Sequence, residues 1–135
     1  MRAELTIVIP ARNESQSLPK LLTSLNRQDY LRLPDTRVFV ADANSTDDTA
    51  EIARSFPARF PIEIIPGGLP ALGRNAGARR ATTRYVLFLD ADVELADSTL
   101  LRRSVDAPEK ASKSDDYFAV DLLNLNVRDV TPNFL

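Results

Sequence analysis

Two aspartates, Asp90 and Asp92, stand two residues apart directly after a short apolar run at residues 85–89. The run predicts a buried strand, because it is too continuous to be half-exposed and too short for a helix. If the chain stays extended beyond the strand, both carboxylates lie on one side of it, where they repel each other and are costly to desolvate. A divalent cation resolves that cost, and Mg²⁺ binds characteristically through one or two carboxylates together with substrate phosphates. The pair therefore indicates metal-assisted diphosphate chemistry; the alternative is that Asp ends the strand because it favours turns.

Another candidate carboxylate, Asp42, follows a second apolar run at residues 38–41. At a strand end it is placed to accept hydrogen bonds from a base or a sugar, or else to form an Asx-turn with its own backbone. The residues at 45–48 are Ser, Thr, Asp and Asp, the types that cap helices. We therefore predict helix caps rather than ligand contacts for residues 45–48.

The sequence GRNAG at residues 73–77 lies inside a predicted helix at residues 70–81. Each glycine inside a helix costs about 1 kcal/mol relative to Ala, so we expect close packing against a sheet or a ligand to offset it. Arg74 lies near the helix start, where it can meet a phosphate or a base with the help of the helix dipole, or else remain solvated. We expect Arg79 and Arg80 to be solvated. The chain contains neither G-x-G-x-x-G nor a P-loop sequence, which counts against dinucleotide oxidoreductases and P-loop NTPases.

The composition limits the chemistry that the chain can perform. Its 135 residues suit one soluble domain, and a formal net charge of −2 gives no electrostatic case for binding nucleic acid. Cysteine and histidine are both absent, so thiolate and imidazole metal ligands and a His general base are excluded, and carboxylates are left for both tasks. Without a visible signal peptide or long apolar stretch, we expect a cytoplasmic protein. If the chain is part of a longer protein, that protein could still associate with a membrane.

Strands and helices must position these residues. Apolar runs predict four strands, at residues 5–9, 38–41, 62–65 and 85–89. Helical patterns lie between and after them. They occur at residues 17–25, from the predicted caps at 45–48 to about residue 54, at 70–81 and at 98–105. The alternation predicts an α/β fold with a mainly parallel sheet flanked by helices. Because ligands of such sheets bind at the carboxyl ends of the strands, the polar clusters at residues 12–14, 42–44 and 90–92 should meet at one rim.

Beyond residue 106 the pattern changes. Residues 107–116 are polar and predict a loop, and apolar residues then alternate with polar ones over residues 123–128, the period of a half-exposed strand. The segment at residues 118–130 is more apolar than a free tail should be. We expect it to pair as a strand, either within its own sheet or with a second copy in a symmetric homodimer. A monomer with this segment folded back as an edge strand is the alternative.

Four stretches together resemble one family, the family-2 glycosyltransferases with the Rossmann-like GT-A fold. They are TIVIPARNE at residues 6–14, VADANSTDDT at 40–49, GRNAG at 73–77 and FLDAD at 88–92. The resemblance covers about residues 4–105, and it is specific because four motifs occur in the right order and spacing. It implies that residues 1–106 are the nucleotide-sugar-binding half of a transferase.

The resemblance also implies roles for individual residues. The base and ribose of the donor would be held by Pro10, Ala11, Arg12, Glu14 and Asp42. Arg74 would lie against the nucleotide, Asp90 would contact the ribose or the metal, and Asp92 would ligate Mn²⁺ or Mg²⁺. The implied reaction is glycosyl transfer with inversion from a nucleotide-diphosphate sugar, by default a UDP-sugar, with the metal neutralising the departing nucleoside diphosphate.

The chain departs from the family after Asp92. The family's general base, an Asp or Glu in a later motif, and its Gln/Arg/Trp-type motif have no match there, and Asp115 and Asp116 lie in a polar loop too early in the chain. We therefore expect a truncated chain, with residues 107–135 as the start of an incomplete acceptor-side region. The catalytic base, the acceptor and the sugar stay unidentified, and the chain alone should be inactive or weakly active.

Two other functions remain open from the sequence. A non-catalytic nucleotide-binding or interaction module would keep the fold without turnover. A sugar nucleotidyltransferase is less favoured, because it needs a Gly-rich loop with Arg or Lys after the first strand, and residues 10–14 contain no glycine.

Overall fold

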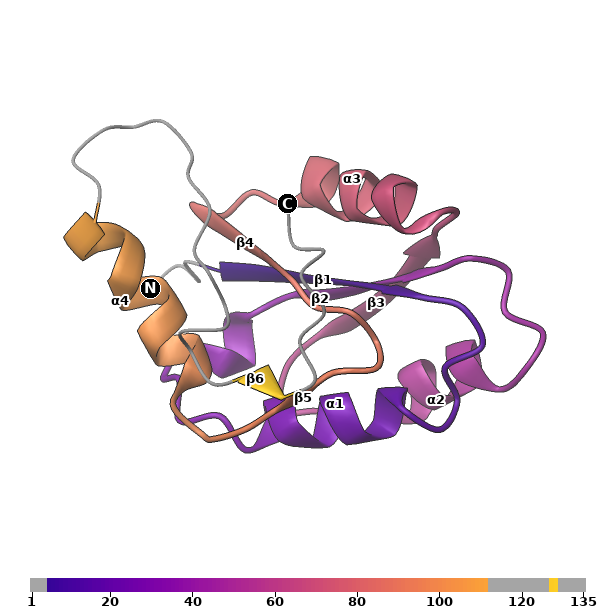
Figure 1. Ribbon diagram of the computed structural model, residues 1–135, viewed down its shortest axis with the longest axis horizontal. Coiled ribbons are helices and arrows are strands. Elements are labelled where there is room, and N and C mark those ends of the chain that lie inside the picture. The colour runs from indigo at the N-terminus through magenta and orange to yellow at the C-terminus, as the bar shows by residue number, and fades with distance from the viewer. Residues whose placement is uncertain (1–4, 112–126, 129–135) are drawn as a thin grey trace.

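A parallel four-stranded sheet forms the centre of the computed structural model, which describes residues 5–111 and 127–128 (Figure 1). The strands are β1 (Leu5–Ala11), β2 (Val38–Asp42), β3 (Ile62–Pro66) and β4 (Tyr85–Phe88), in the order β3-β2-β1-β4. All three pairings are parallel, with Ile7 opposite Val38 and Leu5 opposite Tyr85. The predicted α/β fold with a mainly parallel sheet is confirmed.

Helices cover both faces of this sheet (Figure 1). α1 (Leu18–Asn26) and α2 (Thr49–Ser55) lie on one face, and α3 (Pro70–Arg80) lies on the other. α4 (Leu100–Ala111) places Leu100 and Leu101 in the same apolar cluster as α1, and a 3₁₀ turn (Leu33–Asp35) precedes β2. Within residues 5–111, the structure contains no helix with the length and apolar character needed to cross a membrane.

The order of the strands creates a switch point between β1 and β4. β1, β2 and β3 follow one another outward across the sheet, whereas β4 returns to the other side of β1. Ligands of such sheets bind beside the carboxyl ends of the strands at this kind of reversal. The loops that follow β1, β2 and β4 start at this edge of the sheet, which we call the carboxyl rim.

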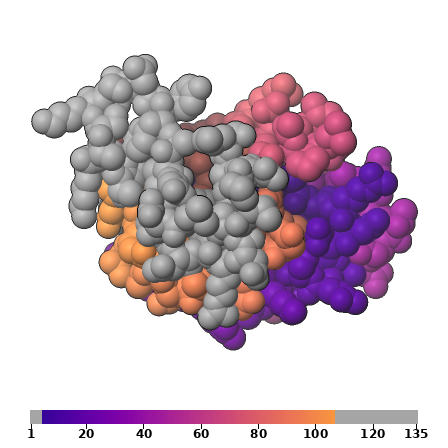
Figure 2. Space-filling model, viewed as in Figure 1, coloured from indigo at the N-terminus to yellow at the C-terminus, as the bar shows by residue number. Residues whose placement is uncertain are grey.

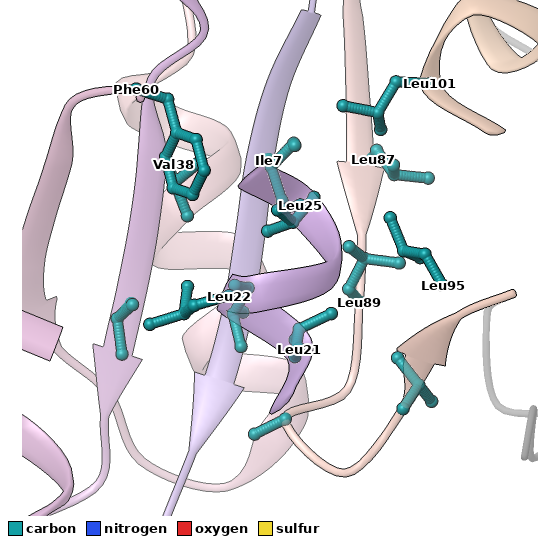
Figure 3. Close-up of a cluster of buried hydrophobic side chains, with 14 of the residues drawn as sticks. Ile7, Leu21, Leu22, Leu25, Val38, Phe60, Leu87, Leu89, Leu95 and Leu101 are labelled. Atoms are coloured by element: carbon teal, nitrogen blue, oxygen red, sulfur yellow. The ribbon is translucent and has the colours of Figure 1, made fainter. Parts of the chain in front are cut away.

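The larger apolar core lies between the sheet and α1 (Figure 3). Leu21, Leu22 and Leu25 of α1 are fully buried, and they face strand side chains such as Ile7. Alternate residues of each strand point into this core, and the residues between them, such as Val8, point towards α3. The helix predicted at residues 17–25 is confirmed, with its ends shifted by one residue.

α3 approaches the sheet closely because its inner face carries glycines. A Cβ atom on Gly77 would lie 2.4 Å from Cγ1 of Val8, and one on Gly73 would lie 3.2 Å from the Cβ of Ala41. Both glycines are buried, so the expected packing reason for GRNAG is confirmed. The close approach also brings Arg74, the residue after Gly73, next to the strand ends.

The first strand was predicted at residues 5–9, ended by Pro10, and this end is wrong because β1 continues to Ala11. The carbonyl of Val8 accepts a hydrogen bond from the N–H of Leu89, which follows β4. The carbonyl of Ala11 instead accepts the N–H of Ala43, which follows β2. Successive strand residues alternate between the two neighbouring strands, so Pro10 faces the β4 side, as Val8 does. Since β4 ends at Phe88, the nitrogen of Pro10 has no ladder bond to supply.

α4 is longer than the sequence predicts. A helix was expected at residues 98–105 and a loop at 107–116, but the helix runs to Ala111. All but one of residues 107–111 are Ala, Glu or Lys, which are strong helix formers, so their composition is compatible with a helix as well as with a loop.

The predicted strand at residues 118–130 is described only in part. β6 (Val127–Arg128) pairs antiparallel with β5 (Glu94–Leu95) of the same chain. The other residues of that segment lie outside the described part of the chain, and the homodimer stays a prediction.

Candidate functional site

Three polar loops leave the carboxyl rim, at the ends of β1, β2 and β4. We call residues 12–17 the first loop, residues 43–48 the second loop and residues 89–93 the third loop. In the space-filling view, the surface of α3 lies beside the indigo surface of the N-terminal segment (Figure 2). Because β1, β2 and β4 are parallel, their carboxyl ends lie at the same edge of the sheet. The prediction that the polar clusters after these three strands share one edge is confirmed.

The third loop turns sharply after β4. The N–H of Val93 donates to the carbonyl of Asp90 over 3.2 Å, which closes a turn. Ala91 and Val93 are buried in the core, whereas Asp90 is partly exposed and Asp92 is exposed. The chain turns here, so the extended conformation on which the sequence interpretation of Asp90 and Asp92 was conditional is not formed. Burial of the apolar side chains at 91 and 93 is what leaves both carboxylates outside the core.

Arg74 joins α3 to the third loop. Its Nη2 atom lies 3.0 Å from Oδ1 of Asp90, with the two side chains 19% and 21% exposed. The Nε atom of Arg74 is buried and has no hydrogen-bond partner among the described residues. A polar atom shielded from water without an acceptor is unfavourable, so an oxygen-rich ligand beside Arg74 would stabilise this arrangement.

The carboxylates of the third loop suit a divalent metal that shares its coordination with a ligand. Within the described residues, Asp92 makes no hydrogen bond or ion pair, and no three acidic side chains gather as a complete metal site. Mg²⁺ does not need such an enclosure, because it binds through one or two carboxylates, water and substrate phosphates. The open Asp92, the partly buried Asp90 and the nearby cation of Arg74 therefore fit a metal that is completed by a diphosphate.

Side chains of the β2–α2 segment bind the backbone of the first loop. Three successive N–H groups donate to three side chains: Asn13 to Oγ of Ser45 at 2.9 Å, Glu14 to Oγ1 of Thr49 at 2.8 Å, and Ser15 to Oδ2 of Asp47 at 3.2 Å. In return, the N–H of Thr46 donates to Oδ1 of Asn13 over 2.8 Å. We call this set of side chains the loop clasp: Asn13, Ser45, Thr46, Asp47 and Thr49.

Equivalent asparagines turn both loops. Asn13 and Asn44 each have a φ of 53°, in the left-handed region that Asn tolerates better than most residues. Ala11 pairs with Asp42 at the strand ends, so each asparagine stands two residues beyond its strand. The sequence analysis missed the loop clasp. The signal that could have found it is this matched pair of asparagines, combined with the strand register.

Asp42 and Glu14 are each oriented by a hydroxyl group. The Oγ of Ser45 donates to Oδ1 of Asp42 over 2.5 Å while it accepts the N–H of Asn13. The Oγ of Ser17 donates to Oε2 of Glu14 over 2.5 Å. Both carboxylates are partly exposed, so each remains able to accept further hydrogen bonds from a ligand.

The prediction that residues 45–48 cap a helix is only partly right. α2 begins at Thr49 with Asp48 in the N-cap position, but Asp48 makes no side-chain capping bond. Asp47 instead accepts hydrogen bonds from the hydroxyl and the N–H of Thr49. The hydroxyl of Thr49 contributes most to holding the pKa of Asp47 below its ordinary value of 3.8. Ser17 likewise occupies the N-cap position of α1 without a capping bond.

The other predicted site residues differ in their access to the rim. Pro10 is partly exposed and contacts α3 near Gly73, and Arg12 is exposed. Ala11 is only 5% exposed and its carbonyl accepts the N–H of Ala43, so its side chain lies in the core rather than on the rim. A surface hollow of about 480 Å³ adjoins the loop clasp, lined by Asn13, Glu14, Ser15, Gln16, Ser17 and Asp47.

Comparison with known proteins identifies the family. The model of the family described as Glycosyl transferase family 2 matches residues 6–121. The chain belongs to glycosyl transferase family 2. This family-2 chain is 38% identical over 96 residues to a 4,4'-diaponeurosporenoate glycosyltransferase of Staphylococcus haemolyticus. That match covers 67% of the chain and 24% of the relative.

Solved structures of named transferases and synthases share the fold. The mannosyltransferase PcManGT from Pyrobaculum calidifontis, in complex with GDP-Man and Mn²⁺, has a TM-score of 0.71 and 26% identity, over 84% of this chain and 34% of that one. Glucosyl-3-phosphoglycerate synthase from Mycobacterium tuberculosis, in complex with Mn²⁺, UDP and glucosyl-3-phosphoglycerate, has a TM-score of 0.55 and 25% identity, over 81% of this chain and 40% of that one. The family-2 chain thus spans between about a quarter and two-fifths of the length of these three proteins.

Proposed function

We propose that this family-2 chain binds a nucleotide-diphosphate sugar on its carboxyl rim, as the donor for glycosyl transfer with inversion. One observation carries the proposal: a partly buried cation, Arg74, contacts Asp90 beside the open carboxylate of Asp92, at the switch point of the sheet. Support also comes from the two solved structures, one of which holds GDP-Man with Mn²⁺ and the other UDP with Mn²⁺. UDP is the nucleotide that we expect here.

In this proposal the nucleoside lies against the first and second loops. Asp42 accepts hydrogen bonds from the base or the ribose, and its bond from Ser45 keeps the carboxylate in one orientation. Pro10 and the polar side chains of Arg12 and Glu14 supply the neighbouring surface. These residues bind and orient the donor, and they take no part in breaking the bond between the sugar and the diphosphate.

The diphosphate lies towards the third loop. Arg74 donates charge-assisted hydrogen bonds to phosphate oxygens, and its buried Nε atom gains the acceptor that the described residues do not provide. Asp92, with Asp90, would hold Mn²⁺ or Mg²⁺, which when bound neutralises the charge that develops on the departing nucleoside diphosphate. Because Arg74 also contacts Asp90, it sets the orientation of that carboxylate.

Calorimetric titration of the chain with UDP and with GDP tests this proposal. Each nucleotide is titrated once in Mn²⁺ and once with chelator. We expect UDP to bind about 100-fold more tightly with Mn²⁺, because several kcal/mol of charge stabilisation depend on the metal. Weak binding of equal strength in both conditions would exclude the metal role, and no binding of either nucleotide would overturn the proposal as a whole.

A further inference from the structure

We propose that Asp47 and Thr49 are positioning residues for the donor nucleoside. In this inference they hold the first loop against the β2–α2 segment, so that residues 12–14 and Asp42 act as one binding surface. The inference rests on the proposed function and deepens it, because it assigns a role in binding to residues that act through others.

Thr49 is the fixed point of the loop clasp. It is fully buried at the start of α2, where its position is set by the packing of the helix against the sheet. Its hydroxyl donates to Asp47 and accepts the N–H of Glu14. One buried hydroxyl group therefore connects the second loop, the first loop and the core.

Asp47 bridges two segments with its two oxygen atoms. Oδ1 accepts the N–H of Thr49 at 3.0 Å, and Oδ2 accepts the N–H of Ser15 at 3.2 Å. Only an ionised carboxylate offers an acceptor on both sides, because the amide of an Asn would turn an NH₂ group towards one of these N–H donors. The same hydrogen bonds favour the ionised form of Asp47, which is why its pKa lies below its ordinary value.

The bridge bears on the nucleoside site through its neighbours. Thr49 accepts the N–H of Glu14 and Asp47 accepts the N–H of Ser15, so both hold the part of the first loop that follows Arg12. Asn13 connects through Ser45 to Asp42. If the clasp opens, the first loop and Asp42 no longer stay in a fixed relation. The apparent dissociation constant then rises in inverse proportion to the fraction of molecules in the binding arrangement.

Two variants and two controls test the inference. Asp47→Asn removes one acceptor from an exposed residue, and Thr49→Val removes the buried hydroxyl while keeping the shape of the side chain. Thr49→Ser keeps the hydroxyl and should restore binding. Asp48→Asn removes the same charge from the adjacent exposed residue, which makes no side-chain capping bond, and it should bind UDP as the wild type does.

The readout separates the nucleoside from the diphosphate. UDP with Mn²⁺ probes both parts of the site, whereas pyrophosphate with Mn²⁺ probes only the side formed by Arg74, Asp90 and Asp92. We expect Asp47→Asn and Thr49→Val to weaken binding of UDP about tenfold, as when one molecule in ten holds the binding arrangement, and to leave pyrophosphate binding unchanged. The amide signals of Glu14 and Ser15 in ¹H–¹⁵N spectra should shift in the same variants.

Each other outcome counts against the inference. It is overturned if the folded variants bind UDP as tightly as the wild type, or if binding of UDP and pyrophosphate falls in parallel, as in general loss of structure. Thermal unfolding of each variant establishes that it is folded at the temperature of titration. A wild-type chain that binds neither nucleotide overturns the proposed function itself. If the wild type binds UDP but the variants do not differ from it as expected, only this inference fails and the proposed function stands.

Discussion

On the β2 side of the carboxyl rim, the loop clasp joins the first and second loops through hydrogen bonds between side chains and backbone. On the β4 side, the third loop contacts α3 through the Arg74–Asp90 ion pair, and Asp92 makes no contact of this kind among the described residues. α3 itself depends on the close approach of Gly77 to the sheet. One side is thus connected by hydrogen bonds, and the other by packing and charge.

This difference matches the chemistry proposed for each side. A nucleoside is recognised by a few directional hydrogen bonds, and a surface that is ordered in advance binds it at a lower cost in entropy. A metal and a diphosphate bring their own charge and complete each other's coordination, so an exposed carboxylate is the better partner. The rim therefore combines an ordered nucleoside side with an open charged side.

The largest effect should come from Asp92→Asn. Removing this carboxylate should lower the affinity for UDP in Mn²⁺ by about 100-fold, to the level measured with chelator, because the metal loses its open ligand. Asp35→Asn, at an exposed site before β2 and so at the opposite end of the sheet, is the matched control. Retention of the metal effect in Asp92→Asn would show that the metal is held elsewhere.

Gly77→Ala tests the packing that holds α3. The added Cβ would lie 2.4 Å from Cγ1 of the fully buried Val8. We expect the free energy of unfolding to fall by about 1–3 kcal/mol, although Ala favours a helix. Gly68→Ala places its Cβ 3.2 Å from a carbon of the exposed Leu72, which can move aside, and should change stability by less than about 0.5 kcal/mol. Equal stability of both variants in urea unfolding would refute close packing at Gly77.

Arg74→Gln should reduce the affinity for UDP about tenfold, both with Mn²⁺ and with chelator, because the guanidinium contributes its own charge to the diphosphate. The loss should shrink as ionic strength rises. Arg79→Gln removes an exposed cation from the same helix and is the control. An Arg74→Gln variant that loses affinity only when Mn²⁺ is present would place Arg74 in the support of the metal rather than beside the phosphates.

The smallest effect concerns pH. The pKa of Asp47 is lower in the folded chain than its ordinary value of 3.8, so this carboxylate stabilises the fold above that value, and the contribution is lost as pH falls through the lowered pKa. Between about pH 5 and pH 3, the Tm of the wild type should therefore fall slightly more than that of Asp47→Asn. Asp97, whose pKa is also lowered, is present in both proteins and cancels in this comparison. Parallel Tm curves would show that Asp47 is not stabilised by the clasp.

The fold was predictable because its signals are local. Apolar runs predicted the four parallel strands, and the glycines at 73 and 77 predicted the close packing that the structure shows against Ala41 and Val8. The predicted end of β1 was wrong because the effect of the missing N–H of Pro10 depends on which neighbouring strand this residue faces, and the sequence does not show that. The end of α4 was missed because polar residues that form helices resemble loop residues in sequence.

The loop clasp was not predictable from local patterns. Ser45, Thr46 and Asp47 have the composition of helix caps, and what they bind lies about thirty residues earlier in the chain. Only the register that sets Ala11 opposite Asp42 brings the two loops together. The acidic pair at 90 and 92 shows the opposite case, because a strand followed by two carboxylates can be recognised from the sequence alone.

The central claim, that the two sides of the rim hold different parts of one nucleotide, can be measured by NMR with UDP and either Mg²⁺ or Mn²⁺. With Mg²⁺, amide signals of all three loops should shift. When paramagnetic Mn²⁺ replaces Mg²⁺, the signals of residues 90–93 should broaden first, those of residues 13–15 and 43–47 less, and those of residues 35–37 at the opposite end of the sheet should stay sharp. Broadening centred on residues 43–48, or shifts confined to the third loop, would contradict this division of the site.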